Sequence, residues 1–246
     1  MKILLLDIET SPNIGAFWGL FKQNISHNHV TKVGRTLCWA AKWHDKKRVH
    51  FSSTHHNGHE EMIEQMWNLL DEADVVVHYN GKKFDMPTLH REFLLQGLVP
   101  PSPYKQVDLY SVVRTNFKFV SNKLDFVCQQ LGLGAKTQHK GMELWFGCME
   151  GKREDWKVMK EYNIQDVALL EDLYDELLPW VKNHPSHGAY TNAERPTCRN
   201  CGSEHVNKKG VEYTATTSYQ RYKCMDCGTN MRGRTSLAKV GAGVLV

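Results

Sequence analysis

Residues 2–12 read KILLLDIETSP, a stretch in which an apolar strand is followed directly by two acidic residues. Four apolar residues lead directly into Asp7, and Glu9 follows two positions later. Side chains two positions apart on a strand leave from the same face, so Asp7 and Glu9 share one. Burying unpaired carboxylates is costly, so the pair predicts a bound cation. The structural alternative is a strand that ends at Leu6 and leaves both acids in water.

Length and composition set the class of protein. The 246 residues suffice for one large domain or for one domain and a small module. Hydrophobic residues make up 41% and charged residues 24%, which predicts a globular chain. No apolar run is long enough to span a bilayer, and the N-terminus lacks the order of a signal peptide. The sequence therefore predicts a soluble, cytoplasmic protein of a bacterium or of a phage-infected host, with no membrane partner.

The hydrophobic pattern predicts an α/β protein in which strands come first and helices follow. We expect strands at residues 2–9, 14–21, 36–43, 49–52 and 74–79. Helices are expected at residues 60–70, 88–96, 108–117, 122–131 and 153–182. One helix lies between two of the strands, which predicts a mixed β-sheet with helices packed on it. Residues 184–196 are poor in apolar side chains and are predicted to be a linker, which separates a domain at 1–183 from a module at 197–246.

Two further elements carry acidic residues. Residues 78–89, HYNGKKFDMPTL, follow a predicted strand and open a helix, with Asp85 at the junction. The structural alternative makes Asp85 the N-cap of that helix, with a proline in its first turn. Tyr162 and Asp166 are four positions apart on a predicted helix and therefore share a face. An exposed acid on a helix is the alternative for Asp166.

In combination, DIET, NGKKFDMP and YNIQD resemble the three motifs of DEDD exonucleases of the RNase H-like superfamily. Tyr162 points to their tyrosine branch, DEDDy. The motifs are most similar to those of the proofreading-type exonuclease domain of family B DNA polymerases. The run from Asp7 to Trp180 also resembles stand-alone phage-type 3′–5′ exonucleases, in the stretches WGLFKQNI (18–25), PPSPYKQVDLY (100–110), SNKLDFVCQQLGLG (121–134) and YNIQDVALLEDLY (162–174).

The resemblance implies an RNase H-like fold and a two-metal active site. Carboxylates and water are the ligands that Mg²⁺ and Mn²⁺ prefer, and two such ions can activate water and neutralise a phosphodiester. By resemblance, Asp7 bridges both metals, while Glu9 and Asp166 complete the site that holds the attacking water. Asp85 then holds the second metal, largely through water, and Tyr162 orients the attacking water.

Four residues near these motifs are candidate contacts to the terminal nucleotide or its phosphates: Thr10, Asn80, Lys82 and Lys83. The alternative for Asn80 is a turn-forming residue, and for the two lysines a solvated basic turn. Trp18, like most tryptophans of the chain, is expected in the core, although an exposed one could stack on a base.

Four of the seven cysteines form two CxxC pairs with 22 residues between them, each pair followed by glycine: Cys198, Cys201, Cys224 and Cys227. Without an export signal, this pattern favours a metal over disulfides, and its spacing is close to that of a tetrathiolate zinc site. With a predicted hairpin over residues 211–224, the module resembles a zinc ribbon that one structural Zn²⁺ would largely fold.

The positive charge is concentrated in this C-terminal part. Residues 191–246 contain nine Lys/Arg and four Asp/Glu, a net +5, whereas residues 1–190 carry −1. This predicts a nucleic-acid contact through basic and aromatic residues; a solvated hairpin or a protein-docking ribbon is the alternative. The set is Lys208, Lys209, Tyr213, Tyr219, Arg221, Tyr222, Lys223, Arg232 and Arg234.

Together these features predict a metal-dependent 3′–5′ exonuclease that acts on single-stranded 3′ ends, with DNA favoured over RNA. The polarity is implied by the resemblance alone. Two other functions fit the same motifs: a nucleic-acid-binding or regulatory protein whose RNase H-like domain no longer cuts, and an endonuclease on the same fold.

Overall fold

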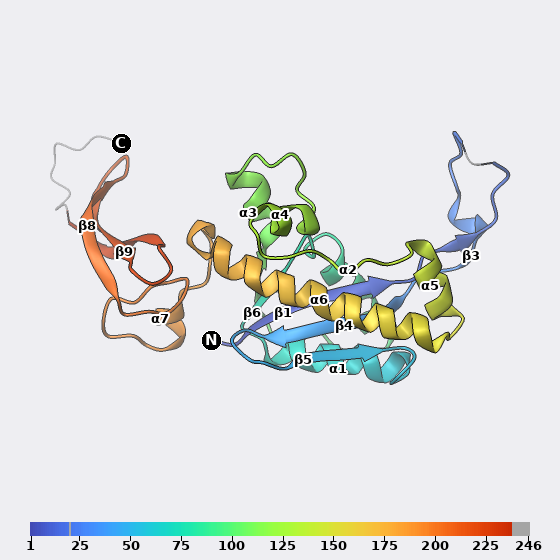
Figure 1. Cartoon of the computed structure of the whole chain (residues 1–246). Helices are drawn as coiled ribbons and strands as arrows, with labels where there is room; N and C mark the ends of the chain where they lie inside the picture. The colour runs from blue at the N-terminus through green and yellow to red at the C-terminus, as the bar shows by residue number, and fades with distance from the viewer. Residues whose placement is uncertain (20, 238–246) are drawn as a thin grey trace.

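The computed structural model describes residues 1–19 and 21–237 (Figure 1). Residue 20 and residues 238–246, the end of the predicted C-terminal module, lie outside the described residues. In the described part, no helix combines the length and apolar character that a membrane span requires.

The centre of the molecule is a five-stranded mixed sheet in the order β5-β4-β1-β6-β7. β4 runs antiparallel to both of its neighbours, whereas β1, β6 and β7 are parallel. The predicted mixed sheet is therefore confirmed, but one of its five strands, β7, was not predicted. β7 escaped prediction because its sequence, KQVD, has a single apolar residue and follows a proline-rich run. The strands are β1 (Ile3–Thr10), β4 (Thr36–Trp43), β5 (Val49–Ser53), β6 (Val75–His78) and β7 (Lys105–Asp108).

Helices cover both faces of this sheet. One core contains Leu4, Leu6 and Ile8 of β1 and the inner faces of α1 (His59–Glu72) and α2 (Asp85–Leu95). The opposite core contains Ile3 and Leu5 and is covered by three helices: α3 (Leu109–Asn116), α4 (Leu124–Gln130) and the long α6 (Arg153–Leu177), which runs across the sheet in Figure 1. Because side chains alternate along a strand, the odd-numbered residues of β1 face α6.

Helix α5 was not predicted. α5 (Met142–Met149) packs against α6 and closes a smaller core with Leu37, Cys38 and Trp156. Its sequence, MELWFGCM, is short and nearly all apolar, so it shows no helical period by which it could have been recognised.

The predicted strand at residues 14–21 is wrong. Only β2 (Ile14–Gly15) is a strand, and it pairs with β3 (Val30–Lys32) and with no strand of the main sheet. A short 3₁₀ helix, His27–His29, precedes β3. The segment forms an arm that extends beyond the end of β1 (Figure 1). Its aromatic residues misled the prediction, since apolar composition favours a strand only where a sheet is available to bury it.

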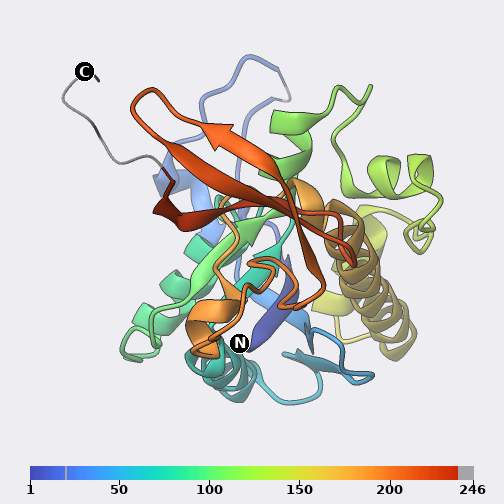
Figure 2. The same cartoon turned by 90° about the vertical axis from the view of Figure 1, so that its left-hand side faces the viewer.

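A separate three-stranded antiparallel sheet, in the order β10-β9-β8, forms the C-terminal part (Figure 2). It consists of β8 (Val206–Tyr213), β9 (Ser218–Cys224) and β10 (Asn230–Ser236), so the predicted hairpin gains a third strand. In the predicted linker, α7 (His187–Tyr190) forms one helical turn, and the buried His184 Nε2 lies 2.6 Å from Tyr174 Oη of α6. The segment between the two parts is thus anchored to α6.

Candidate functional site

Three acidic residues converge where β1 passes beneath α6. Asp7 and Glu9 point from the face of β1 that α6 covers, and Asp166 comes from α6 itself. One carboxylate oxygen from each of the three lies within 4.8 Å of the other two. Asp166 is 157 or more positions away from Asp7 and Glu9 in the chain, yet the three residues form one cluster. The alternative in which Asp7 and Glu9 follow a strand that ends at Leu6 is wrong, because β1 continues to Thr10.

Asp85 lies next to this cluster. It is the first residue of α2, and the N-cap is Phe84, so the structural alternative of an Asp85 N-cap is wrong. The side chain instead crosses to β1, where Oδ1 accepts a hydrogen bond from the backbone N–H of Ile8 at 3.2 Å. This bond fixes a fourth buried carboxyl group beside the three that converge.

A lysine that the sequence did not reveal is inserted into the cluster. Lys136 Nζ lies 2.5 Å from Asp166 Oδ2 and 3.2 Å from the hydroxyl of Tyr162. Its backbone N–H donates to Asp125 Oδ1 at 2.8 Å, which holds the loop between α4 and α5 in place. An ammonium group therefore partly neutralises the acids.

Asn163 was also missed. It is fully buried, and its Nδ2 donates to Asp7 Oδ2 at 2.7 Å. It stands next to Tyr162 in the third motif. Its Nδ2 also donates to the backbone oxygen of Asp7 at 3.4 Å, so both hydrogen bonds span 156 positions of the chain. Asn163 fixes the orientation of the Asp7 carboxylate and leaves the second oxygen available.

Burial and mutual repulsion disfavour the ionised forms of the carboxyl groups in this cluster. Burial raises the pKa of Asp7 well above its usual range, and the charges of Glu9, Asp85 and Asp166 raise it further. Burial and the charge of Asp166 raise the pKa of Glu9 to about 8, against the opposing effect of Lys136. The pKa of Asp85 is raised to about 6, chiefly by burial. Burial likewise raises the pKa of Asp166. Like charges in one site disfavour full ionisation, and a bound cation reverses that preference.

The ligand atoms suit a hard divalent cation. Asp166 Oδ1 is buried and has no hydrogen-bond partner among the described residues. Such an oxygen is costly to leave unpaired, and it belongs to the ligand type that Mg²⁺ and Mn²⁺ prefer. The acidic cluster could therefore hold a metal ion.

A cavity of about 610 Å³ opens beside Asp7 and Lys136, between the loop after β6 and the start of α4. Asn80, one of the predicted substrate contacts, lines it. Asn80 also forms a turn, with a φ of 64° and a backbone N–H that donates to Asp108 Oδ1 at 2.9 Å. The structure is thus compatible with both interpretations of this residue.

The other three predicted contacts lie outside this cavity. Lys82 lines a different cavity of about 280 Å³, and Lys83 is exposed. Thr10 pairs with Thr36 of β4, just past an irregularity in the register of β1. Their roles stay predictions.

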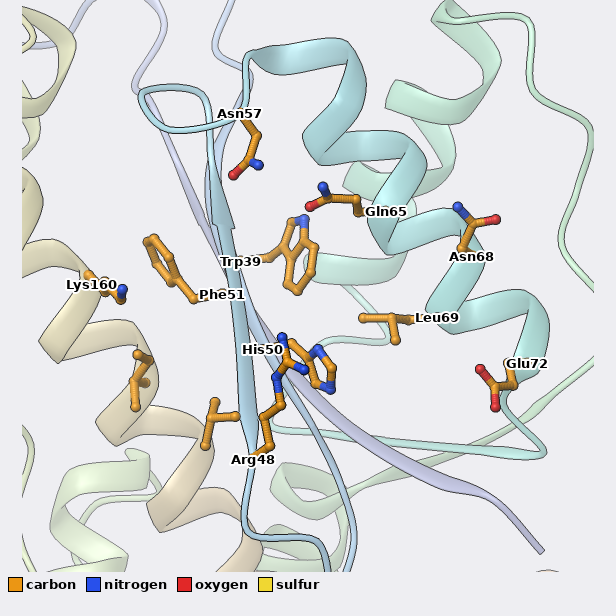
Figure 3. Close-up of a pocket in the computed structure, with 12 residues that line it drawn as sticks. Trp39, Arg48, His50, Phe51, Asn57, Gln65, Asn68, Leu69, Glu72 and Lys160 are labelled. Atoms are coloured by element: carbon orange, nitrogen blue, oxygen red, sulfur yellow. The ribbon is translucent and has the colours of Figure 1, made fainter.

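A cavity of about 570 Å³ lies at the outer edge of the sheet, between β5, α1 and α6 (Figure 3). It is lined by amides and charged groups such as Arg48, Asn57, Gln65 and Lys160. None of the acidic residues of the cluster borders it, so the two sites are separate.

The four C-terminal cysteines form a second cluster, with one Sγ of each within 4.8 Å of the others. The Sγ–Sγ separation is 3.6 Å for Cys198–Cys227 and for Cys201–Cys224, and none is in a disulfide. Although burial raises the pKa of the Cys224 thiol, backbone N–H groups of Cys227 and Asp226 lower it to about 7. Four convergent sulfurs with such N–H donors fit a zinc ribbon.

Comparison with known proteins agrees with this geometry. A sequence profile of the RNase H superfamily matches residues 22–178, more than half of the chain. The chain belongs to the RNase H superfamily. Its fold is also similar to that of the family B DNA polymerase from the hyperthermophilic archaeon Pyrobaculum calidifontis, with a TM-score of 0.57 and 18% identity. The match covers 90% of this chain and 32% of the polymerase, so the chain spans about a third of the polymerase's length. Comparison with curated protein sequences finds no match.

Membership in the RNase H superfamily supports nuclease activity in general and therefore a nucleic-acid substrate. The similarity to the polymerase shows the fold alone. The expected RNase H-like sheet is thus confirmed. The acidic cluster is formed where the first and third acidic motifs, DIET and YNIQD, come together.

Proposed function

We propose that this RNase H superfamily protein is a metal-dependent 3′–5′ exonuclease that removes nucleotides from single-stranded 3′ ends. One observation carries the proposal: the carboxylates of Asp7, Glu9 and Asp166 converge within 4.8 Å. A chain gains no stability by gathering buried like charges, so their convergence is best explained by a reaction that needs them.

In this proposal Asp7, Glu9 and Asp166 would hold one Mg²⁺ or Mn²⁺, and Asp7 and Asp85 would help to hold a second. When bound, the ions would supply Lewis-acid stabilisation of the phosphate and a hydroxide-like nucleophile at neutral pH. Asn163 would keep the shared carboxylate in position through its 2.7 Å hydrogen bond.

Tyr162 is proposed to orient the attacking water as a hydrogen-bond donor. Burial and the charges of Asp166 and Glu9 raise the pKa of its phenol above the usual value, so it stays protonated at neutral pH. It therefore cannot serve as the base. Burial opposes the charge on Lys136, but Asp166 and Tyr162 more than compensate and raise the pKa of its ammonium, which stays positive. Because Lys136 also lines the cavity beside Asp7, its ammonium could contact a substrate phosphate there.

DNA is the proposed substrate in preference to RNA, and 3′–5′ the proposed direction. Support for both comes from the resemblance of the DIET, NGKKFDMP and YNIQD motifs to proofreading exonuclease domains. The structural neighbour is, by its description, a DNA polymerase. Thr10, Asn80, Lys82 and Lys83 are proposed to contact the substrate; of these, Asn80 borders the cavity beside Asp7.

We also propose that residues 1–183 form the nuclease domain and that residues 184–196 link it to a zinc ribbon at 197–246. One Zn²⁺ on the four cysteines would hold the ribbon together. Its exposed cations, among them Lys208, Lys209 and Arg234, favour a nucleic-acid contact over a protein partner.

Incubation of end-labelled linear and circular single strands with Mn²⁺ tests the proposal. A ladder that shortens from the 3′ end is the expected result. Cut circles would replace the exonuclease by an endonuclease, and intact substrates would leave a binding protein. Matched DNA and RNA oligomers with blocked 3′ or 5′ ends determine the substrate and the direction.

A further inference from the structure

The arm formed by residues 12–35, which we call the aromatic arm, has a firmly held base. It leaves β1 two residues after Glu9, and Ser11 N–H closes its root by donating to Arg35 O at 2.9 Å. Gly34 N–H donates to Asn13 Oδ1 at 2.7 Å, and the Arg91 guanidinium of α2 donates to Gly34 O at 2.8 Å. A Cβ at Gly34 would lie 2.4 Å from Ser11 O, so this close crossing requires glycine. The root is therefore fixed relative to the acidic cluster.

Beyond the root, the arm exposes aromatic rings instead of burying them. Trp18 is 96% exposed, Phe21 is 86% exposed and Phe17 is 53% exposed. The expectation that Trp18 belongs to the core is therefore wrong. Three exposed rings on a short projection leave apolar surface in contact with water, which is unfavourable. Among the described strands, β2 and β3 pair only with each other, so the main sheet does not extend beneath the rings.

The charge of the arm has a single sign. Residues 12–35 include Lys22, Lys32 and Arg35 and no acidic residue; indeed no Asp or Glu occurs between Glu9 and Asp45. All three cations are exposed, and none of them takes part in the ion pairs found among the described residues. A polyanion is the partner that this charge complements.

Exposed rings interleaved with unpaired cations form the type of surface that binds single-stranded nucleic acid. Bases stack on the rings, and cations follow the phosphates. Such stacking requires unpaired bases, because a duplex keeps its bases stacked on one another. A protein partner with an acidic, apolar surface could meet the same rings, but the position of the arm, anchored at the end of the strand that carries Asp7 and Glu9, favours the substrate.

We propose that the aromatic arm binds the unpaired nucleotides of the strand whose 3′ end lies in the acidic cluster, with Trp18 and Phe21 as stacking platforms. This inference rests on the proposed exonuclease function. It predicts that the enzyme holds a long single strand much better than a substrate too short to reach from the cluster to the arm.

The test compares two substrates and three variants. Trp18→Ala/Phe21→Ala should weaken binding of a long fluorescent oligonucleotide by about fivefold or more, since each stacked base contributes about 1–3 kcal/mol. Binding is measured by anisotropy in an Asp7→Asn background, so that cleavage does not interfere. The same pair of changes, made in the otherwise unaltered chain, should leave hydrolysis of a dinucleotide unchanged.

Two controls match this variant. Trp18→Tyr/Phe21→Tyr retains the rings and should retain most of the binding. Leu94→Ala/Leu95→Ala removes two apolar side chains of α2 that are similarly exposed, at 78% and 74%, and should change nothing. Unaltered binding in Trp18→Ala/Phe21→Ala would overturn the proposal. So would an equal loss on the long and the short substrate, or a shift in sedimentation that identifies the arm as a contact between two copies of the chain.

Failure of the exonuclease proposal would look different. If the chain binds the oligonucleotide through the arm but degrades neither substrate, the binding surface stands and the catalytic assignment falls. If the chain degrades both substrates with and without the two rings at the same rates and affinities, the exonuclease stands and the arm has no part in it.

Discussion

The two candidate metal sites of this chain are built in opposite ways. The acidic cluster takes Asp7 and Glu9 from β1 and Asp166 from α6, and the two cores on either side of the sheet hold these elements in place. The cysteine cluster takes its ligands from two local knuckles within about 30 positions of the chain. Few side chains of the described part beyond residue 196 are fully buried, and two of these are Cys198 and Cys224.

The difference indicates whether the fold positions the ligands or a bound metal stabilises the fold. A large core positions the carboxylates although they repel one another, so the fold creates the acidic site and bears its cost. In the C-terminal part the core is too small to stabilise three strands alone, so a metal on the thiolates would contribute folding energy. Removing ligands should therefore affect activity at the first site and stability at the second.

The largest expected effect is on catalysis at the acidic cluster. Asp7→Asn or Asp166→Asn removes a proposed metal ligand that would contribute several kcal/mol of transition-state stabilisation, which corresponds to a loss of on the order of 10³-fold in rate. Degradation of a 3′-end-labelled oligonucleotide measures it. The control is Asp172→Asn, which removes an exposed acid from the same helix and should leave the rate unchanged. Folding, followed by circular dichroism, should persist in all three; near-full activity of Asp7→Asn would remove the assignment.

The second effect is on the structure of the C-terminal part. Cys224→Ser should abolish zinc binding, which elemental analysis detects as a loss of one zinc per chain, because a tetrathiolate site rarely tolerates the loss of a ligand. Residues 197–237 should then become sensitive to protease while the remainder of the chain stays resistant.

The C-terminal part contacts the segment that follows α6, so this second effect should extend beyond the C-terminal part. The buried Asn200 lies between two of the cysteines, and its Nδ2 donates to Leu178 O at 2.6 Å and to Val181 O at 3.2 Å, just after α6. A modest fall in the melting temperature of the whole chain should therefore accompany zinc loss. Cys148→Ser serves as the control, since this buried cysteine belongs to α5, outside the cysteine cluster, and its replacement should leave the zinc content intact.

The same contrast explains what the sequence could predict. The acids and Tyr162 lie in short motifs whose residue types are dictated by metal chemistry, and the cysteines lie in knuckles whose spacing is dictated by zinc. Lys136 and Asn163 carry no such signature. Lys136 reaches Asp166 only because Asp125 holds its loop, and one lysine in a turn predicts nothing without that contact.

The same distinction applies to the fold: features with a local sequence pattern could be predicted, and those that depend on tertiary contacts could not. The alternation of side chains along β1 predicted that Asp7 and Glu9 would share the face of Ile3 and Leu5. The arm could not be predicted, because its rings have the composition of a buried strand. In the described structure its two strands pair with each other and not with the main sheet, a tertiary property that the sequence does not show.

A smaller effect is expected at the phenol of the acidic cluster. Tyr162→Phe retains the ring but loses the hydroxyl that would orient water, so cleavage should slow by about 10- to 100-fold, the range for groups that position a ligand. Tyr104→Phe is the control, because its hydroxyl lies 2.9 Å from His90 Nε2, away from the cluster. Metal affinity, measured by Mn²⁺ titration, should stay the same in Tyr162→Phe; an equal loss of affinity would mean that the residue shapes the metal site.

The smallest effect compares two glutamates whose pKa values move in opposite directions. Burial and neighbouring acids raise the pKa of Glu9 to about 8. Burial also disfavours the charged form of Glu92, but hydrogen bonds from His59, Arg91 and the Thr36 N–H outweigh it and lower its pKa to about 2. The unfolded value is about 4.3 for both. Stability from Glu9 therefore falls as pH rises from about 4.3 to 8, because the folded state binds the extra proton. Stability from Glu92 is present above about 4.3 and is lost as pH falls toward 2.

Thermal melts without added Mg²⁺ or Mn²⁺ test this opposition. At pH 9, Glu9→Gln should melt a few degrees above the unaltered chain, because a neutral amide removes the repulsion, and the gain should vanish near pH 4. Glu92→Gln should melt below the unaltered chain at neutral pH, since the amide cannot replace a carboxylate that accepts from three donors. Mn²⁺ should raise the melting temperature of the unaltered chain and of Glu92→Gln, but much less that of Glu9→Gln. A Glu9→Gln variant less stable than the unaltered chain at pH 9 would mean that Glu9 stabilises the fold. The contrast between Glu9, whose charge destabilises the fold, and Glu92, whose charge stabilises it, would then be wrong.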